Sequence, residues 1–323
     1  MSTQLNPAVS VILPILNEER DLHDCISAIL QQKYDGELEV ILALGPSTDN
    51  TNQIANSLAQ ADSRIKLVNN PTGKTAAALN LAIAAASSEI ICRIDGHAEI
   101  SDTYIKTAVE IMMQTGAVNV GGLMHASADR GFQSVVATAM RSRIGVGASK
   151  FHTGGEAGAA DTVYLGTFKK SAILQAGGFD EKYIRAQDWE LNHRLRLNGG
   201  VIWFDPRLVV TYQPRDTFRK LAKQYFEYGR WRRAVSREHK GTVNYRYLAP
   251  PLALVINALS LILGLLSSTI FFTPVIIYLT VIILSSLFIG KSIYAKLTLP
   301  LVLITMHISW GYGFITSPKN LIN

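Results

Sequence analysis

Charge is missing from a long stretch of the sequence: residues 248–290 contain no Asp, Glu, Lys, Arg or His. A helix needs about 20 apolar residues to cross about 30 Å of hydrocarbon. The stretch is too long for one crossing, so it predicts two membrane helices, near 248–271 and 274–290. Residues 297–316 predict a third helix, although His307 makes it less apolar. Buried helices of a soluble protein are the alternative for all three.

Cysteine is also scarce. Cys25 and Cys92 are the only two and lack C-x-x-C spacing, which disfavours a disulfide framework. Both fall at apolar positions and are expected to be reduced core thiols. The first eight residues are short and polar, unlike a signal peptide, so the N-terminal part is expected to stay in the cytoplasm. No internal repeat or low-complexity segment is evident.

The net charge of +6 is concentrated just before the apolar stretch. Residues 215–246 contain ten Lys and Arg but three acidic residues, a net +7. Such a segment favours anionic lipid headgroups, by about 1 kcal/mol per basic residue near the surface. Nucleic acid is the alternative partner of a basic run, but the adjoining membrane helices argue against it. The basic segment also contains an apolar stripe of the kind found in helices that lie on a membrane. The stripe consists of Phe218, Leu221, Ala222 and Tyr225.

Lysines between the apolar runs predict an orientation. Lys291 and Lys296 separate the second and third runs, whereas the junction of the first two runs is uncharged. Because cytoplasmic loops are enriched in Lys and Arg, the lysine-containing loop is expected on the same side as the N-terminal domain. Three crossings would leave residues 317–323 outside, and Lys319 is a mild signal against that placement.

The N-terminal part alternates strand and helix patterns, which predicts an α/β fold with a mostly parallel, Rossmann-like sheet covered on both faces. Ligands of such sheets bind at the carboxyl ends of the strands. The predicted strands are 9–14, 37–44, 64–69 and 89–95, and the helices are 21–32, 75–86 and one capped by residues 47–49. Beyond residue 95 the pattern predicts helices at 103–115 and 188–198, strands at 117–124, 163–168 and 201–204, and a mobile glycine-rich loop at 142–160.

Asp95-Gly96-His97 places two side chains that can bind metal directly after the fourth strand. Oxygen and imidazole ligands suit Mn²⁺ or Mg²⁺ bridging a diphosphate. The metal would neutralise the charge that builds on a leaving nucleotide. A turn with a capping Asp is the alternative interpretation.

Four further charged residues are candidates for chemistry. Asp188 opens a predicted helix and could act as a general base, with a helix N-cap as the alternative. Glu190 is a reserve candidate for the base. Lys74 lies at a helix start, where anions are favoured, and a solvated surface lysine is the equal alternative. Arg230, in the basic segment, could pair with a phosphate of a nucleotide or a lipid, or merely contact headgroups.

Several ordered motifs together resemble glycosyltransferase family 2, the inverting enzymes with a GT-A nucleotide-sugar-binding fold. Among its members the chain is most similar to bacterial exopolysaccharide enzymes of the succinoglycan-biosynthesis type, which carry a short membrane tail. The motifs are the opening strand and turn at 9–19, S-T-D-x-T at 47–51, G-K to L-N at 73–80, the D-x-D region at 93–98, and the acceptor-side block at 177–191.

The resemblance implies that Asp95 and His97 hold the divalent metal and that Asp188 deprotonates the acceptor. It also implies a nucleotide site made of Pro14, Asn17, Glu18, Lys74 and Asp95. Residues 224–231 resemble a relaxed form of the family's Q-x-x-R-W signature, which would add Arg230 and Trp231 to the donor site. The wrong spacing of that signature argues against processive polymer synthesis.

Three positions depart from the family pattern. Leu44 stands where many members have an Asp that contacts uracil, and His97 stands at the third D-x-D position. Gln187 replaces the acid that usually precedes the base.

The expected protein is a membrane-anchored inverting glycosyltransferase. It comprises a GT-A domain at 1–212, a basic interfacial segment at 213–247 and a membrane region at 248–317. It would transfer a sugar from a nucleotide-diphosphate sugar to a lipid-linked saccharide at a bacterial inner membrane, with the catalytic domain in the cytoplasm. One alternative uses polyprenyl phosphate as acceptor, and another is a non-catalytic nucleotide-sugar-binding membrane subunit. A transport protein is disfavoured because the spans contain no carboxylate or arginine.

Overall fold

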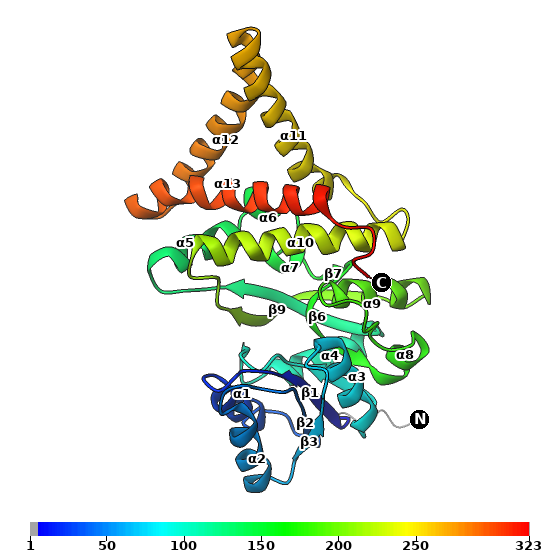
Figure 1. The fold of residues 1–323 in the computed structure, drawn as a ribbon. Helices are drawn as coiled ribbons and strands as arrows, with labels where there is room; N and C mark the ends of the chain where they lie inside the picture. Colours follow the sequence, from blue (N-terminus) through cyan, green and yellow to red (C-terminus); the bar gives the residue numbers. More distant parts are fainter. Residues whose placement is uncertain (1–5, 323) are drawn as a thin grey trace. The chain divides into compact units, whose positions relative to one another are not determined.

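The computed structural model describes residues 6–322, which form two compact units (Figure 1). Unit 1 contains the residues up to His125 together with Gly154–Tyr212. Unit 2 contains Ala126–Thr153 and the residues from Gln213 onward. The boundary expected at residue 212 therefore coincides with the end of unit 1. Residues 126–153, however, were expected in the N-terminal domain and belong to unit 2, because their helices pack against the last helix of the chain.

Unit 1 is built on a mixed sheet. Its first strands are parallel, as the alternating pattern predicts, and the later strands that pair with β4, β8 and β9 are antiparallel. The strands of the described chain lie in the order β3-β2-β1-β4-β8-β6-β9-β5, and β7 also pairs with β9. Their bounds are β1 Val9–Ile15, β2 Leu38–Leu44, β3 Ile65–Asn69, β4 Ile90–Arg93, β5 Glu99–Ile100, β6 Asn119–Ala126, β7 Gly158–Ala159, β8 Tyr164–Lys169 and β9 Ile202–Tyr212.

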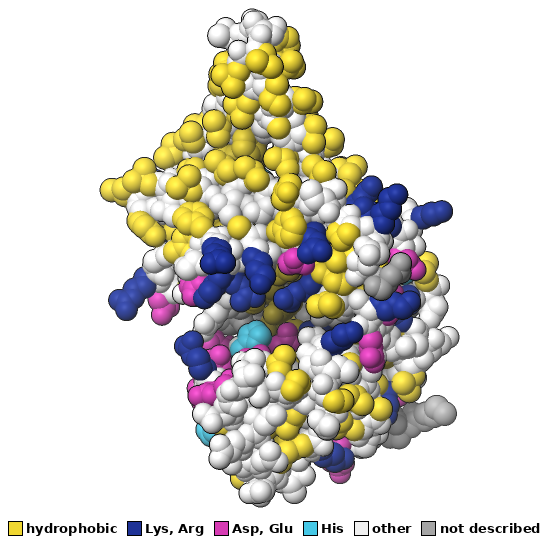
Figure 2. Space-filling model, in the orientation of Figure 1, with side chains coloured by type: hydrophobic (Ala, Val, Ile, Leu, Met, Phe, Trp, Pro, Cys, Tyr) yellow, Lys and Arg dark blue, Asp and Glu magenta, His cyan; other side chains and the backbone are white. Residues whose placement is uncertain are grey.

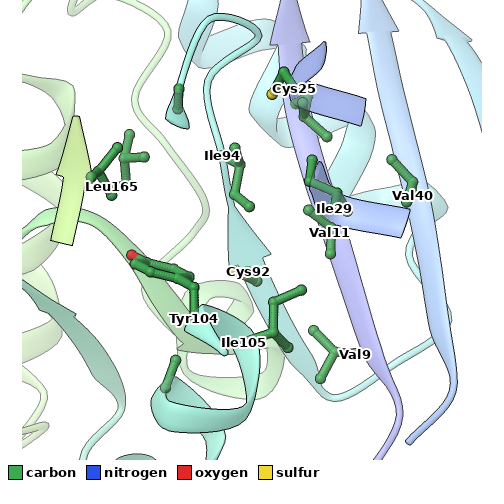
Figure 3. Packing of buried hydrophobic residues seen from close by; sticks show 14 of the residues in the cluster. Val9, Val11, Cys25, Ile29, Val40, Cys92, Ile94, Tyr104, Ile105 and Leu165 are labelled. Carbon is green, nitrogen blue, oxygen red and sulfur yellow. The ribbon is translucent and has the colours of Figure 1, made fainter. Parts of the chain in front are cut away.

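Helices cover both faces of this sheet. On one face β1 directs Val9 and Val11 toward Ile29 of α1 and Ile105 of α4 (Figure 3). On the other face Ile12 belongs to a second buried cluster with α3, α8 and α9. Burial on both faces explains the continuous apolar run of β1. The helices are α1 Leu22–Leu30, α2 Thr51–Ala61, α3 Thr75–Ala85, α4 Tyr104–Thr115, α8 Lys170–Gln175 and α9 Gln187–Leu197. Cys25 and Cys92 are free and buried, as expected.

Two segments differ from the sequence-based expectation. The last strand was expected to end at residue 204. In the structure β9 continues to Tyr212, and Pro206 lies between the stretch paired with β7 and the stretch paired with β5. The glycine-rich residues 142–160, expected as a mobile loop, contain α6 (Arg143–Val146), α7 (Lys150–Thr153) and β7.

Unit 2 is helical. Its apolar part contains three helices long and apolar enough to cross a membrane: Tyr245–Leu266, Thr269–Ile289 and Ile293–Thr316. They correspond to α11, to the short helix η1 (Thr269–Phe272) with α12 (Thr273–Ile289), and to α13. The remaining helices are α5 (Gly131–Met140), α6, α7 and α10 (Phe218–Glu238), and α10 packs most extensively against α13. Leu221 and Tyr225 of α10, two residues of the stripe that was expected to face a membrane, are buried.

The charges divide unequally between the units. Unit 2 contains 17 Lys and Arg but four Asp and Glu, a net +13. Unit 1 contains 14 basic and 21 acidic residues, a net −7. The overall charge of +6 therefore conceals a strongly basic unit and an acidic one, because the basic residues of 126–153 add to those of the C-terminal segment.

Candidate active site

The turn after β1 is held by the segment that precedes α2. Asn17 has a φ of 57°, a left-handed conformation that asparagine tolerates better than most residues. Its Oδ1 accepts a hydrogen bond from the backbone N–H of Thr48 at 2.8 Å. The N–H of Glu18 donates to Oγ1 of Thr51 at 2.7 Å. The S-T-D-x-T segment thereby fixes the position of Glu18. The cap expected there is different, since α2 begins at Thr51 with Asn50 at the N-cap position.

Glu18 in turn contacts the segment that follows β4. Its Oε1 lies 2.9 Å from Nδ1 of His97, and this hydrogen bond raises the pKa of His97. Gly96 allows the close approach. A Cβ at that position would lie 2.8 Å from Cδ1 of Ile15 and 3.0 Å from Cγ of Glu18. The carboxyl ends of β1 and β4 therefore bring Glu18, Asp95 and His97 into one cluster, as the strand-end rule predicts.

The donor set of this cluster fits a divalent metal. A histidine that binds metal commonly donates its second ring N–H to a carboxylate, which fixes the tautomer. With Nδ1 of His97 on Glu18, Nε2 is the nitrogen that could bind a metal, and the carboxylate of Asp95 could supply an oxygen. Among residues 6–322 no group of three His, Cys, Asp or Glu could hold a metal. Mg²⁺ and similar ions often take one or two protein ligands and complete their shell with substrate phosphates and water, so two ligands suffice.

Arg93 connects Asp95 to Asp188. The side chain of this last residue of β4 is 4% exposed. Its Nε donates to Oδ1 of Asp95 at 3.1 Å, and its Nη1 donates to Oδ1 of Asp188. Burial opposes the charge, but Asp188 and Asp95 outweigh it and raise the pKa of Arg93. One buried cation thus holds the candidate metal ligand and the candidate base in the same cluster, although Asp188 follows Arg93 by 95 residues.

The structure places Asp188 within α9 and not at its cap. Ala186 occupies the N-cap position with a φ of 63°, and it has no side-chain capping bond. The N-cap alternative for Asp188 is therefore wrong, since its carboxylate turns toward Arg93 instead. Burial raises the pKa of Asp188, and Arg93 opposes that shift. Glu190, the reserve base, forms a two-point ion pair with Arg194 at 2.6 and 2.7 Å, which is a structural contact within α9.

Removal of the Arg93 cation is expected to destabilise unit 1. Arg93→Gln leaves the partly buried carboxylates of Asp95 and Asp188 without the cation between them. Removal of one partner of a buried ion pair lowers the free energy of unfolding by about 3–5 kcal/mol. The double variant Arg93→Gln/Asp188→Asn should recover part of this loss, because the repulsion is gone. Thermal unfolding followed by circular dichroism measures both. The control Lys33→Gln removes an exposed ion pair to Asp102 and should leave the unfolding temperature nearly unchanged. Equal stability of Arg93→Gln and Lys33→Gln would contradict the role of Arg93.

The remaining predicted residues of unit 1 lie at the same edge of the sheet or beside it. Pro14 pairs with Ala43 near the carboxyl ends of β1 and β2. Lys74 is exposed at the N-cap position of α3. The preceding Gly73 approaches Pro46, since a Cβ there would lie 3.2 Å from Cδ of that proline.

Sequence reasoning missed two residues that position Asp188. Arg93 was noted only as part of the D-x-D region. Asn80 of α3 binds the backbone of Phe179 in both directions, as donor and acceptor at 2.8 Å, and its amide lies 3.0 Å from the carboxylate of Glu181. It thereby anchors the loop that leads to α9. The presence of both residues inside family-like motifs was the available signal.

Arg230 and Trp231 belong to unit 2. Arg230 forms an ion pair with Glu227 at 2.9 Å and lies over the ring of Phe226 at 5.4 Å. Trp231 is 3% exposed. Gln224 donates to the hydroxyl of Tyr228 at 2.9 Å. These contacts give Arg230 and Trp231 defined structural partners, and their expected role in donor binding stays a prediction.

Comparison with known proteins gives the family of the chain. Residues 10–168 match the family model described as glycosyl transferase family 2. The succinoglycan biosynthesis protein ExoA of Rhizobium meliloti is 33% identical over 74% of this chain and 73% of its own length. A Methanococcus voltae enzyme is 27% identical over 95% of both chains. Its name is dolichyl N-acetyl-alpha-D-glucosaminyl phosphate 3-beta-D-2,3-diacetamido-2,3-dideoxy-beta-D-glucuronosyltransferase.

A solved structure shares the fold. The mannosyltransferase PcManGT from Pyrobaculum calidifontis, in complex with GDP-Man and Mn²⁺, superposes with a TM-score of 0.67 at 21% identity. The match covers 94% of this chain and 87% of that one. Together with the mixed sheet of unit 1 and the three apolar helices, it identifies a GT-A-like domain followed by helices that could span a membrane. The chain belongs to glycosyltransferase family 2.

Proposed function

We propose that the chain is an inverting glycosyltransferase of a bacterial inner membrane. It transfers a sugar from a nucleotide-diphosphate sugar to a lipid-linked saccharide. The observation that carries this proposal is the single cluster in which Arg93 joins Asp95, beside His97 and Glu18, to Asp188. A metal-and-diphosphate site and a base within one cluster are the parts that such a reaction requires.

Asp188 is the proposed base. Its carboxylate accepts the proton of the acceptor hydroxyl while that oxygen forms a bond to the anomeric carbon, and the bond to the diphosphate oxygen breaks. Attack from the face opposite the leaving group inverts the anomeric centre. Burial raises the pKa of Asp188, which makes the carboxylate a better proton acceptor, and the cation of Arg93 favours its ionised form.

Asp95 and His97 are the proposed metal ligands, and Glu18 orients His97 through Nδ1. A bound Mn²⁺ or Mg²⁺ would neutralise charge on the leaving diphosphate. Pro14, Asn17 and Lys74 lie near the ends of β1 and β2 or at the start of α3, and there they are proposed to line the nucleotide site. PcManGT was solved with GDP-Man and Mn²⁺, which supports a nucleotide sugar and a divalent metal as ligands.

The proposal of a lipid-linked acceptor has two supports. The name of the Methanococcus voltae relative describes a sugar transferred to a dolichyl-phosphate-linked N-acetylglucosamine. Unit 2 combines three apolar helices with a net charge of +13, which favours a membrane with anionic lipids and a phosphate-bearing acceptor. Basic residues next to a membrane helix favour the cytoplasmic side, and the basic residues 215–246 precede the first apolar helix. The part of the chain before that helix, which includes unit 1, is therefore proposed to lie in the cytoplasm.

The test is a transfer assay with the detergent-solubilised full chain. A panel of nucleotide sugars is offered with a bacterial lipid extract, and the product is analysed by mass spectrometry and by NMR of its anomeric proton. The expected product is an extended lipid-linked saccharide with an inverted anomeric centre. A sugar attached directly to polyprenyl phosphate would replace the proposed acceptor by polyprenyl phosphate itself. A retained anomeric configuration, or donor binding without turnover on any lipid, would overturn the proposal.

A further inference from the structure

The third apolar helix of unit 2 binds lengthwise to a charged helix. At Gly229 of α10 a Cβ would lie 2.0 Å from the carbonyl oxygen of Trp310, and at Gly313 of α13 one would lie 2.0 Å from that of Phe226. The two backbones therefore touch at two points, and no side chain fits between them. Beyond these points the ring of Tyr312 packs 5.8 Å from that of Phe226.

The contact continues past the end of α13. Oγ of Ser317 donates to the carbonyl of Arg230 at 2.9 Å. Arg237 donates to the carbonyls of Ser317 and Pro318 at 2.9 and 2.8 Å. The helices run in the same direction, side by side, and Figure 1 shows α13 lying along α10 while α11 and α12 project from this pair and meet at η1.

The charge of α10 keeps it out of hydrocarbon. Nine of its 21 residues are charged, seven of them Lys or Arg. A charged residue at the centre of a bilayer costs about 3 kcal/mol or more on insertion scales. Such a helix stays at the headgroup level, and a partner bound along its length stays there too. Figure 2 shows dark-blue side chains gathered over α10 and none over the parts of α11 and α12 that project away from it.

The N-terminal half of α13 is also held by unit 2. Nε2 of His307 lies 2.8 Å from the carbonyl oxygen of Ile144 in α6. Leu299, Val302 and Leu303 have no exposed surface, and α13 also packs on α5. Of the apolar window of α13, 39% is buried, against 17% for α11 and 11% for the helix that contains α12. The opposite face is apolar and exposed, and it consists of Leu297, Leu301, Ile308 and Ile315. One packed face and one apolar open face suit a helix in the membrane interface.

The lysines agree with this placement. Lys291 and Lys296 lie at the start of α13 and Lys319 lies just after its end, whereas the junction of α11 with η1 carries no charge. Because Lys and Arg favour the cytoplasmic side, both ends of α13 favour the same side of the membrane. Lys319, which argues against a third crossing, is consistent with an α13 that does not cross the membrane.

We infer that α13 lies in the plane of the membrane on α10, so that the chain crosses the bilayer twice, through α11 and α12. The C-terminal residues then lie on the same side as α10. The 22 residues of α11 extend about 33 Å, enough for one crossing. The inference rests on the proposed membrane placement but does not depend on which sugar or acceptor is used.

The test is cysteine labelling with a membrane-impermeant maleimide on sealed vesicles of both orientations. The native Cys25 and Cys92 are buried, so the background is low. Single cysteines replace three exposed residues: Lys240→Cys after α10, Ser268→Cys between α11 and η1, and Asn320→Cys after α13. The expected result is that Lys240→Cys and Asn320→Cys react in one vesicle orientation and Ser268→Cys reacts only in the other.

Two results would overturn the inference. Labelling of Asn320→Cys together with Ser268→Cys would show a third crossing through α13. Labelling of all three positions from one side would show that the hairpin does not cross. Release of the protein from the vesicles by carbonate would instead refute the membrane placement in the proposed function. Loss of sugar transfer in these vesicles would concern only the proposed reaction, since the labelling pattern does not require turnover.

Discussion

Replacement of Asp188 by Asn is expected to lower the rate of sugar transfer by about a thousandfold, the scale of general-base catalysis. Asparagine has nearly the same shape, and its side-chain oxygen can still accept the hydrogen bond from Arg93. It cannot accept the proton of the acceptor hydroxyl at neutral pH. The fold and the donor site are therefore expected to persist while the chemical step fails.

Three measurements make this result specific. Donor affinity by calorimetry should change little in Asp188→Asn, whereas single-turnover transfer should collapse. Asp161→Asn provides the matched control, because Asp161 is an exposed acid of the same unit, 3.5 Å from Arg196, and should transfer sugar normally. Thermal unfolding checks that both variants are folded. Full activity in Asp188→Asn would reject Asp188 as the base and return attention to another carboxylate near the site.

Loss of the proposed divalent metal is expected to have the second large effect. A metal that neutralises charge stabilises the transition state by several kcal/mol. Chelation of the metal or Asp95→Asn should therefore reduce the rate of sugar transfer by about a thousandfold or more. His97→Ala should act similarly. Glu18→Gln should have a smaller effect, about 10- to 100-fold, because Glu18 acts by orienting His97.

The order of these effects is as informative as their size. Mn²⁺ binding, followed by electron paramagnetic resonance, gives a readout independent of turnover. The affinity for Mn²⁺ should fall least in Glu18→Gln, more in His97→Ala and most in Asp95→Asn. Asp24→Asn is the control, since its carboxylate is 93% exposed on α1. Undiminished Mn²⁺ binding in both Asp95→Asn and His97→Ala would place the metal elsewhere or remove it from the mechanism.

The part of the site that sequence reasoning predicted is local. Asp95 and His97 follow an apolar strand directly, and Asn17 and Glu18 follow another. Parallel neighbours in a sheet bring such ends together without any knowledge of side-chain packing. The bond between His97 and Glu18 is a consequence of that geometry.

The link from Arg93 to Asp188 could not be predicted in the same way. It joins the fourth strand to a helix 95 residues later, and its geometry depends on a left-handed Ala186 and on the loop anchored by Asn80. No periodicity records such contacts. A charged residue in an otherwise apolar strand was the available hint, because a buried arginine needs carboxylate partners.

The membrane region shows a different limit. Length and hydropathy identify α11, α12 and α13 alike, because they show whether a helix could cross a membrane and not which other helices it packs against. The placement of α13 depends on Gly229 and Gly313, which let two backbones touch. The sequence pattern did not indicate that residues 126–153 group with the C-terminal helices, since α5 packs on α13, a helix more than 100 residues away.

The return of the chain from unit 2 to unit 1 at Gly154 has a practical consequence. Neither unit is a single cassette that can be cut out at one peptide bond or exchanged between relatives at one junction. Truncation after Tyr212 would keep α5 but remove α13, the helix that packs on it. A water-soluble version of the sheet-containing unit would need residues 126–153 replaced by a short linker as well.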